Sequence, residues 1–524
     1  MMKSKTMYQY NLGISFATIV DRFPNKLALK LPALNEFLTY SELNNHSNRL
    51  ARYLINCGIK QKDVVCIAGK KSTLTYICIL ACLKIGAIYS VLDPNTPIER
   101  LKKILSICQP KLLFLDNKLA GLFNRIDIET TVLKHDLEII SKESSTFSSN
   151  NLEETKRVVG TTPAYIMFTS GSTGFPKGAV ITHANVLNFI AWNIETFKVT
   201  PDDILTNVNS LYFDNSVFDI YTAFFSGSTL ISFTKAEVTD PELLLDLLDK
   251  HKCTSWFSVP SLLIYLQNMR ALRKNKLTHL KRFIFGGEGY PKAKLKELYD
   301  LYGDRITFYN VYGPTECACM CSAYIISKND LKDLYGFAPL GQIALNFDYL
   351  ILDGNEKIVS EGEVGELCLL GPNVGLGYYN DPERTSMSFV QNPSNKIYKE
   401  IMYKTGDLVL YNPYDNNIYI KGRKDYQIKH MGYRIELEEI ENALNQLDYV
   451  DQAAAIHVVR NNLSKIFGIV QLNAKIEETK LREDLENIIP SYMIPTNFYF
   501  EKILPKNANG KLDRKTLQLK YGAV

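Results

Sequence analysis

The sequence predicts an α/β protein with a large N-terminal part of layered α/β subdomains plus a β section, and a small α+β C-terminal domain. Three observations predict this fold. The chain has 524 residues, too many for one ordinary domain. Helical and strand-like patterns alternate over residues 40–116. After about residue 424, two helical patterns and several short strands follow within roughly one hundred residues, which suffices for a small domain. We therefore expect a division into residues 1–424 and 425–524.

The alternation in the N-terminal part indicates a largely parallel sheet. Apolar residues over 43–54 form one helical face that Gly58 can end, and residues 64–68 then resemble a strand. A second helical pattern over 98–108 is followed by a strand-like run at 112–115. Helices that alternate with strands in this way are typical of a layered α/β domain.

A β section and a cluster of cysteines follow later in the chain. Within residues 349–370, Asp353-Gly354 separates two strand-like runs, which suggests antiparallel pairing. Cys317, Cys319 and Cys321 alternate, but their spacing is not that of a zinc site. We expect these cysteines on one face of a strand.

Composition excludes several classes of protein. The net charge of +4 is close to neutral for this length, and it argues against a nucleic-acid-binding or membrane-surface protein. The most apolar stretch, residues 74–92, is interrupted by Lys84, so we expect a buried helix and a strand and no membrane insertion. The N-terminus lacks the apolar core of a signal peptide, and the ten scattered cysteines favour reduced thiols. A cytoplasmic location is therefore expected.

The strongest local feature is the segment T-S-G-S-T-G-F-P-K-G at residues 169–178, directly after a strand-like run at 164–168. Glycines and small hydroxyl residues allow backbone N–H groups to approach a polyphosphate closely, and Lys177 adds a compact positive charge. No G-K-[ST] sequence closes the segment, so it is not a Walker loop. Taken alone, it also fits a flexible glycine/serine loop.

Four further segments follow in order. Residues 312–316 (Y-G-P-T-E) combine an aromatic ring, a tight turn, a hydroxyl and a carboxylate. Residues 403–407 (Y-K-T-G-D) end in an acid suited to bonding a ribose diol. Residues 422–425 (G-R-K-D) and the turn at 509–511 (N-G-K) complete the series. Each segment alone fits ordinary loop chemistry, but the ordered set favours a functional site.

With these motifs in order, the sequence resembles the adenylate-forming superfamily over nearly its whole length. Within it, the sequence is most similar to adenylation domains of nonribosomal peptide synthetases and to D-alanine–carrier protein ligases. Further family motifs are L-T-Y-S-E-L from Leu38, F-D-N-S from Phe213 and Y-M-I-P from Tyr492. The resemblance implies ATP-dependent activation of an amino acid to aminoacyl-AMP with release of pyrophosphate. Transfer to the phosphopantetheine thiol of a carrier protein would follow.

The resemblance also implies an ATP site. The residues expected to wrap the phosphates are Thr169, Ser170, Gly171, Ser172, Thr173, Gly174 and Lys177, with Thr315 assisting. Glu316 would hold Mg²⁺, which balances the charge of a triphosphate. Tyr312 would stack on adenine beside Gly287 and Glu288. Asp407 would bind both ribose hydroxyls, reinforced by Arg423.

Lys511 is the residue that the resemblance implies to be catalytic. When the substrate carboxylate attacks the α-phosphate, two anions meet, and a lysine that reaches both counters the growing charge. Loss of one such group costs about 3–4 kcal/mol, or about 10²–10³ in rate. A solvated surface lysine is the alternative for this polar loop.

Asp214 is implied to bind the α-ammonium group of an amino acid, although a helix N-cap with Ser216 close by is the alternative. The implied side-chain pocket consists of Asn215, Phe218, Phe257, Ile284, Gly286, Val311, Cys319 and Met320. Its lining is mostly apolar and uncharged, which disfavours a charged side chain. We expect a small-to-medium aliphatic substrate such as isoleucine or valine.

The C-terminal residues are implied to move. Asp425 corresponds to the hinge between the two domains, and Lys429 and Gly432 to the tunnel for the thiol. Lys511 is needed at the phosphates in the first reaction, and the phosphopantetheine thiol must reach the adenylate in the second. Residues 425–524 are therefore expected to rotate between the two reactions.

Alternative functions stay open on the sequence alone. No L-G-G-x-S carrier motif follows Arg514, so we expect a separate carrier protein. The alternatives are a D-alanine–carrier protein ligase, an acyl-CoA ligase for a simple carboxylic acid, and a catalytically silent binding relative. Acyl-CoA ligases generally lack the acid found at Asp214. Intact Lys511, Glu316, Asp407 and Lys177 argue against a silent relative.

Overall fold

The structure is a computed structural model that describes residues 9–115, 135–136, 142–460, 463–506 and 512–522. The chain forms two compact units. The first unit comprises Met1–Pro94, Gln109–Met167 and Ala179–Gly422, and the second comprises Asn95–Cys108, Phe168–Gly178 and Arg423–Val524. The segment expected to wrap phosphate thus belongs to the second unit. The functional division into residues 1–424 and 425–524 stays a prediction.

The first sheet is built around parallel strands, and its edge strand β18 pairs with β8 in antiparallel fashion. In order of pairing they are β18 (Gly377–Tyr378), β8 (Lys177–Thr182), β7 (Pro163–Thr169), β4 (Ile88–Leu92), β3 (Val64–Ala68), β5 (Leu112–Leu115) and β6 (His135–Asp136). β3 pairs in parallel with both β4 and β5. Every residue of these three strands is buried, which explains their continuous apolar runs.

Two helices beside this sheet show how the sequence directs local structure. α2 (Tyr40–Asn56) begins with a capping box in which Thr39 and Glu42 bond each other's backbone N–H groups. α3 (Thr73–Ile85) is buried along residues 75–85. Lys84 lies inside α3, and its ammonium group donates to Asn44 Oδ1 at 2.7 Å and to Asn48 Oδ1 at 2.6 Å on α2. The charge that interrupts the apolar stretch is thereby satisfied inside the protein.

The second sheet carries five of the expected site residues on its strands, Phe257, Ile284, Gly286, Val311 and Tyr312. Its strands in order of pairing are β15 (Gln342–Ile343), β14 (Ser322–Ile325), β13 (Thr307–Tyr312), β12 (Arg282–Gly286), β11 (Ser255–Ser258), β9 (Ile204–Asn207), β10 (Thr229–Ser232), β1 (Leu27–Leu31) and β2 (Glu36–Thr39). From β13 to β1 all neighbouring pairs are parallel. Their carboxyl ends therefore meet at one edge of the sheet, where open α/β sheets bind ligands.

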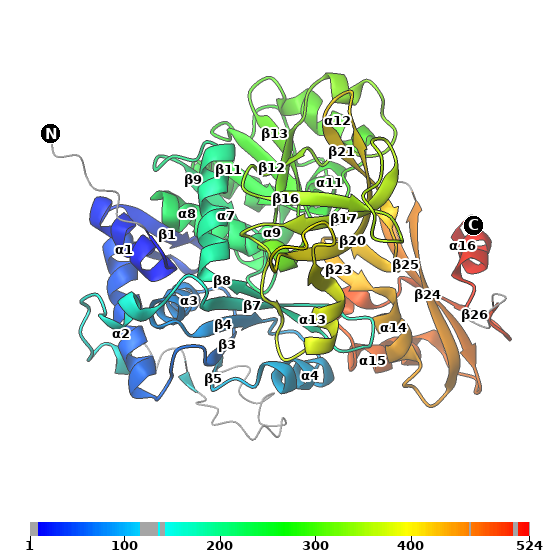
Figure 1. The fold of residues 1–524 in the computed structure, drawn as a ribbon, viewed down its shortest axis with the longest axis horizontal. Coiled ribbons are helices and arrows are strands. Elements are labelled where there is room, and N and C mark those ends of the chain that lie inside the picture. The colour runs from blue at the N-terminus through cyan, green and yellow to red at the C-terminus, as the bar shows by residue number, and fades with distance from the viewer. Residues whose placement is uncertain (1–8, 116–134, 137–141, 461–462, 507–511, 523–524) are drawn as a thin grey trace. The chain divides into compact units, whose positions relative to one another are not determined.

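Helices cover the two sheets of the first unit that are described above (Figure 1). Further α-helices of this unit, within the described residues, include α1 (Leu12–Arg22), α7 (His183–Thr196), α8 (Asn215–Ser226), α9 (Lys235–Thr239), α10 (Pro241–Lys250), α11 (Pro260–Asn268), α12 (Lys292–Tyr302) and α13 (Pro382–Ser388). Its short 3₁₀ helices are η1 (Pro32–Leu34), η2 (Glu154–Arg157), η3 (Thr315–Cys317) and η4 (Asn329–Leu331). α8 packs against α1 and α7 and belongs to the main buried apolar cluster.

A third, antiparallel sheet completes the first unit. It pairs β16 (Asp348–Leu352), β17 (Val364–Leu370), β20 (Ile401–Asn412) and β19 (Phe389–Gln391), and β21 (Asn417–Arg423) pairs with β20. β16 and β17 are the two runs on either side of Asp353-Gly354, so the predicted β section is confirmed.

The second unit is a small α+β assembly around its own apolar core. Its elements are α4 (Ile98–Cys108), β22 (Gln427–His430), β23 (Tyr433–Glu436), α14 (Leu437–Leu444), β24 (Val450–Arg460), β25 (Leu463–Leu472), α15 (Glu478–Glu486), η5 (Ser491–Met493), β26 (Asn497–Phe500) and α16 (Arg514–Gly522). β24, β25 and β26 form one sheet, and β22 and β23 form a hairpin.

The predicted strand for the alternating cysteines is wrong. Cys317 ends η3, and the next two residues have positive φ angles, 60° at Ala318 and 82° at Cys319. β14 begins only at Ser322. The alternating cysteines therefore begin in a turn and not in a strand, because residues with positive φ angles do not have the extended backbone of a strand. All ten cysteines lie in the described part of the chain, and none of them forms a disulfide there.

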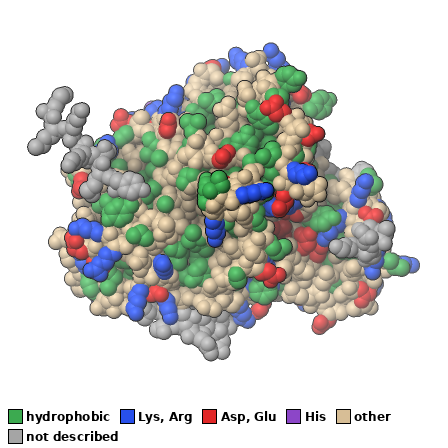
Figure 2. Space-filling model, in the orientation of Figure 1, with side chains coloured by type: hydrophobic (Ala, Val, Ile, Leu, Met, Phe, Trp, Pro, Cys, Tyr) green, Lys and Arg blue, Asp and Glu red, His purple; other side chains and the backbone are tan. Residues whose placement is uncertain are grey.

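Charges of both signs share the surface. On the face drawn in Figure 2, Lys and Arg side chains are interspersed with Asp and Glu side chains. This mixture fits the small net charge of +4. Within the described ranges, no helix is both long and apolar enough to cross a membrane.

A buried ionic network ties the amino ends of three neighbouring strands of the second sheet. Asp203 precedes β9 and accepts hydrogen bonds from Arg282 of β12 at 2.9 Å, from Thr254 before β11 at 2.8 Å and from the Thr200 N–H at 2.9 Å. Burial alone would raise the pKa of Asp203, but the bonds and charge of Arg282, followed by those of Thr200 and Thr254, outweigh it. The pKa of this carboxyl therefore lies far below its ordinary value.

We predict that Arg282→Met destabilises the protein by about 3–5 kcal/mol at pH 7, because it leaves the Asp203 charge buried without its main partner. Thermal unfolding measures the loss. Lys281→Met is the matched control: Lys281 bonds the same carboxylate at 3.3 Å but is 57% exposed, so the cost is about 1 kcal/mol or less. A depressed carboxyl pKa contributes its full stability only above the unfolded pKa, and this contribution is lost as the pH falls toward the folded pKa. The stability deficit of Arg282→Met therefore shrinks below about pH 4. An equal loss in both variants would contradict this assignment.

Candidate active site

Parallel pairing of β11, β12 and β13 brings the expected pocket residues together. Phe257 on β11 is the register partner of Ile284 on β12, and Gly286 on β12 is the partner of Val311 on β13. A Cβ atom built on Gly286 would lie 2.4 Å from the Val311 carbonyl oxygen. Only glycine fits this close approach between the two strands.

The predicted lining forms a common apolar wall. Phe218, Phe257, Ile284, Val311, Cys319 and Met320 all belong to one cluster of buried apolar side chains. The rings of Phe218 and Phe257 meet edge to face with centroids 5.0 Å apart. Burial raises the pKa of the Cys319 thiol, and the nearby carboxylates Asp214 and Asp219 raise it further. The thiol is therefore neutral, and the wall is free of charge from this residue.

Asp214 stands at the start of α8, but its carboxylate makes no capping hydrogen bond to the helix. Instead the Thr315 hydroxyl donates to Asp214 Oδ2 at 2.5 Å. Ser216 donates to the Phe213 carbonyl oxygen at 2.7 Å. The structure does not bear out the capping alternative. The hydrogen bond between Thr315 and Asp214 was not indicated by the sequence.

Two residues expected at the nucleoside are bonded to each other. The Tyr312 hydroxyl donates to Asp407 Oδ2 at 2.6 Å, and both side chains are almost completely buried. Burial and then the Asp407 charge raise the pKa of Tyr312 well above its ordinary value. The phenol therefore stays protonated and donates its hydrogen to the Asp407 carboxyl oxygen.

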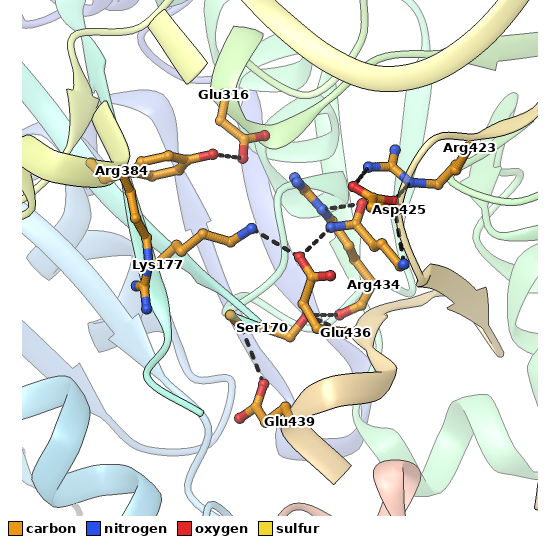
Figure 3. A network of polar contacts seen from close by, with 12 residues as sticks. Ser170, Lys177, Glu316, Arg384, Arg423, Asp425, Arg434, Glu436 and Glu439 are labelled. Atoms are coloured by element: carbon orange, nitrogen blue, oxygen red, sulfur yellow. Dashed lines mark hydrogen bonds and ion pairs between the residues drawn. The ribbon is translucent and has the colours of Figure 1, made fainter. Parts of the chain in front are cut away.

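Glu316, the expected Mg²⁺ ligand, is fully buried in η3, which follows β13. Tyr378 on β18 donates its hydroxyl hydrogen to Glu316 Oε1 at 2.7 Å (Figure 3). Mg²⁺ is usually held by one or two carboxylates together with substrate phosphates and water, so a single oriented carboxylate fits this ion. Tyr378 was missed from sequence, because no local spacing links residues 316 and 378.

The Glu288 carboxylate bonds Ser261 at the start of α11. Its carboxylate accepts hydrogen bonds from the backbone N–H of Ser261, at 2.7 Å, and from the Ser261 hydroxyl. Ser261 lies in the first turn of α11, so the carboxylate satisfies backbone donors at the start of that helix. The expected positions of Gly287 and Glu288 beside adenine stay predictions.

In the second unit, the phosphate loop (residues 169–177) is bonded to the β23–α14 segment (Figure 3). The Ser170 hydroxyl donates to the Arg434 carbonyl oxygen at 2.7 Å and accepts from the Glu436 N–H at 3.1 Å. The Lys177 ammonium group donates to Glu436 Oε1 at 2.9 Å, and both side chains are largely buried. The expected phosphate-binding lysine is thus paired with a carboxylate.

A second carboxylate contacts the same loop. Glu439 on α14 accepts a hydrogen bond from the Gly171 N–H at 3.3 Å, and it forms an ion pair with Arg100 of α4. Lys103 of α4 donates to the Gly174 carbonyl oxygen at 2.9 Å. Carboxylate oxygens of Glu436 and Glu439 therefore occupy donors that the sequence analysis expects to hold phosphate oxygens.

The expected hinge and tunnel residues lie near the start of the C-terminal segment. Arg423 forms a two-pronged ion pair with Asp425 at 2.6 and 2.7 Å. Burial raises the pKa of Asp425, but the bonds and charge of Arg423 outweigh it and hold this pKa below its ordinary value. Lys429 pairs with Arg434 across the β22–β23 hairpin, whose turn includes Gly432 at φ 81°. Lys511 lies outside the described residues.

The family follows from comparison with known proteins. A model described as AMP-binding enzyme matches residues 16–379, more than half of the chain. This chain belongs to the AMP-binding enzyme family. A second model, described as AMP-binding enzyme C-terminal domain, matches residues 439–511 of this AMP-binding enzyme. The resemblance to the adenylate-forming superfamily is thereby confirmed.

Among its relatives is tyrocidine synthase 3 of Brevibacillus parabrevis, which is 32% identical over 100% of this chain. Gramicidin S synthase 1 of Brevibacillus brevis is 31% identical over 98% of this chain. The chain spans only 8% of the first relative and 44% of the second. This AMP-binding enzyme is therefore a homologue of nonribosomal peptide synthetase adenylation domains, a class of adenylate-forming ligases.

Solved structures confirm the predicted α/β fold of the AMP-binding enzyme. The Vibrio cholerae adenylation domain AlmE in complex with glycyl-adenosine-5'-phosphate has a TM-score of 0.83 at 22% identity, over 99% of both chains. NpsA-ThdA, an artificially fused adenylation–PCP di-domain from Klebsiella oxytoca, has a TM-score of 0.82 at 23% identity, over 94% of both chains.

We predict that Gly286→Ala disrupts the wall of the pocket. The new methyl group meets the Val311 carbonyl at 2.4 Å, so β12 or β13 must shift, at a cost of about 1–3 kcal/mol. Thermal unfolding shows the loss of stability. Gly354→Ala is the control, since nothing lies within 4 Å of its Cβ position. Equal unfolding temperatures for the two variants would contradict the close approach.

Proposed function

We propose that this chain activates an amino acid with ATP, forms aminoacyl-AMP and pyrophosphate, and passes the acyl group to the phosphopantetheine thiol of a carrier protein. The observation that carries the proposal is the Asp214 carboxylate, which contacts Thr315 instead of capping α8 and belongs to the same region as the apolar wall. An anion beside an apolar wall suits a ligand with an ammonium group and an apolar side chain.

The apolar wall supports a small-to-medium aliphatic side chain. Phe218 and Phe257 restrict the space with their edge-to-face contact, and Gly286 contributes no side chain. The buried Cys319 thiol is neutral. A charged substrate group would lose hydration without gaining a partner from these residues. Isoleucine and valine fit this environment.

In the first reaction, an oxygen of the amino-acid carboxylate bonds to the α-phosphorus, the bond from that phosphorus to the bridging oxygen breaks, and pyrophosphate leaves. Lys511 would counter the charge that builds on the pentavalent phosphorus. The phosphate loop and Lys177 would hold the phosphates, and Glu316 would hold Mg²⁺. When bound, the metal ion balances the phosphate charge and polarises the phosphoryl oxygens. Asp407 and Tyr312 would bind the nucleoside.

In the second reaction, the thiol sulfur attacks the carbonyl carbon of the adenylate, the thiol proton passes to solvent, and AMP leaves. We propose that residues 425–524 rotate about Asp425 between the reactions, so that Lys429 and Gly432 line the path of the thiol. The contacts of the phosphate loop with Glu436 and Glu439 support a rotation between the two reactions, because phosphates and these carboxylates would compete for the same donors. The relative named as an adenylation–PCP di-domain supports a carrier as acceptor.

Amino-acid-dependent release of pyrophosphate tests the proposal. We predict that ATP, Mg²⁺ and one aliphatic L-amino acid give strong release in a panel of the common L-amino acids plus D-alanine. Lys511→Ala should lower the rate by about 10²–10³ while ATP still binds. A response to D-alanine alone would support a D-alanine–carrier protein ligase instead. Formation of a CoA thioester from a simple carboxylic acid, without any amino-acid response, would contradict the proposal.

We predict that Asp214→Ala raises the KM for the amino acid by on the order of a hundredfold or more, because the substrate ammonium group loses its buried partner. The KM for ATP should stay within about threefold. Steady-state pyrophosphate release measures both constants. Asp202→Ala, an exposed acid, is the control and should change neither. An equal rise of both constants for Asp214→Ala would contradict the ammonium contact.

A further inference from the structure

A buried carboxylate outside the predicted pocket lies directly behind its wall. Asp219 is on α8, one residue after Phe218, and is 1% exposed. Its Oδ2 accepts hydrogen bonds from the side-chain amides of Asn207, at 2.7 Å, and Asn209, at 2.9 Å. Its Oδ1 is buried and has no hydrogen-bond partner in the part of the chain that the structure describes. No family motif in the sequence singled out this residue.

Asn209 joins this carboxylate to the pocket wall. Its side-chain amide donates a hydrogen bond to Asp219 and another, at 3.0 Å, to the carbonyl oxygen of Phe257. An amide NH₂ group has two hydrogens, so these contacts use both of its donors. A chain of hydrogen bonds therefore runs from α8 to the backbone of β11.

The end of strand pairing explains why a side chain is needed here. β9 ends at Asn207, and its pairing with β11 is recorded at Ser255 and Leu205. Phe257 lies two residues beyond that pair, where β11 continues to Ser258. The Asn209 amide thus supplies a donor to the Phe257 carbonyl at the place where the strand ladder with β9 stops. Buried backbone carbonyls need such a partner.

A polar cluster fixes the other side of Asp219. Asn207 Oδ1 accepts from the Tyr76 hydroxyl at 2.8 Å, and Lys71 donates to the Asn207 carbonyl oxygen at 2.9 Å. Burial raises the pKa of Asp219 and lowers the pKa of Lys71, while their mutual attraction opposes both shifts. Asn207 and Asn209 therefore hold the Asp219 carboxylate, and Tyr76 and Lys71 in turn fix Asn207.

From this geometry we infer that Asp219 is a positioning residue which, through Asn209, holds the Phe257 wall of the amino-acid pocket and thereby sets discrimination between side chains. The inference rests on the proposed function for the substrate, but the contact itself can be tested without activity. α8 contacts Phe257 in two ways. Asp219 is linked to the Phe257 carbonyl through Asn209, and the Phe218 ring packs edge to face on the Phe257 ring. A pocket distinguishes side chains by one methylene with about 1–3 kcal/mol, or about 10–200-fold, only while its walls stay in place.

The kinetic test compares Asp219→Ala, Asn209→Ala and Asp219→Asn in pyrophosphate release. The substrates are the best amino acid of the panel and its homologue with one methylene fewer. Both alanine variants should raise the KM for the amino acid about tenfold and reduce discrimination to a few-fold, with the KM for ATP within about twofold. Asp219→Asn keeps the acceptor oxygen and should retain most discrimination. The double alanine variant should be no worse than either single one, because both act through the same carbonyl.

Hydrogen–deuterium exchange of the same variants tests the contact independently of activity. Amides of residues 255–259 should exchange about tenfold faster in Asp219→Ala and Asn209→Ala, and at the wild-type rate in Asp219→Asn. Thr222→Ala is the matched control, a buried polar residue on the same helix that accepts from Asn193 at 3.0 Å. Unchanged exchange in both alanine variants, or equal effects of Asp219→Ala and Asp219→Asn, would overturn the inference. A wild-type protein that activates no amino acid, with exchange as predicted, would overturn only the proposed function.

Discussion

The parallel register of β9, β11, β12 and β13 is the constraint on which the site in the first unit depends. The buried Asp203 carboxylate ties the amino ends of β9, β11 and β12, so these strands cannot slip relative to one another without breaking a charged network. The carboxyl ends of β11, β12 and β13 then present Phe257, Gly286 and Tyr312 at one edge of the sheet. Pocket wall and nucleoside residues follow from the same alignment.

In the second unit, the cationic and N–H donors of the phosphate loop are paired with carboxylates. A largely buried ammonium group such as that of Lys177 needs an anionic partner, because burial of an unpaired charge is costly. Glu436 supplies that partner, and Glu439 does the same for the Gly171 N–H group. The donors are therefore already arranged for anions. Under the proposed function, binding of a polyphosphate would exchange these carboxylates for phosphates.

Local sequence patterns predicted elements wherever one periodicity dominated. The helix over residues 98–108 and the strands at 64–68 and 112–115 are present at those positions. The strand expected for Cys317, Cys319 and Cys321 is absent from this described segment, because a turn with positive φ angles gives the same alternation as an extended strand. Spacing alone does not distinguish these two conformations.

The sequence by itself determined the family, the order of the motifs and the residue types of the site, because reactive groups and turn residues occur in short local segments. Only the tertiary structure decided which of them touch. Thr315 bonds Asp214 across 101 residues, Tyr378 bonds Glu316 across 62, and Asn209 links Asp219 to the Phe257 carbonyl. Contacts of this kind depend on strand order and helix packing, which arise from burial of apolar surface throughout the chain and leave no local pattern at the residues concerned.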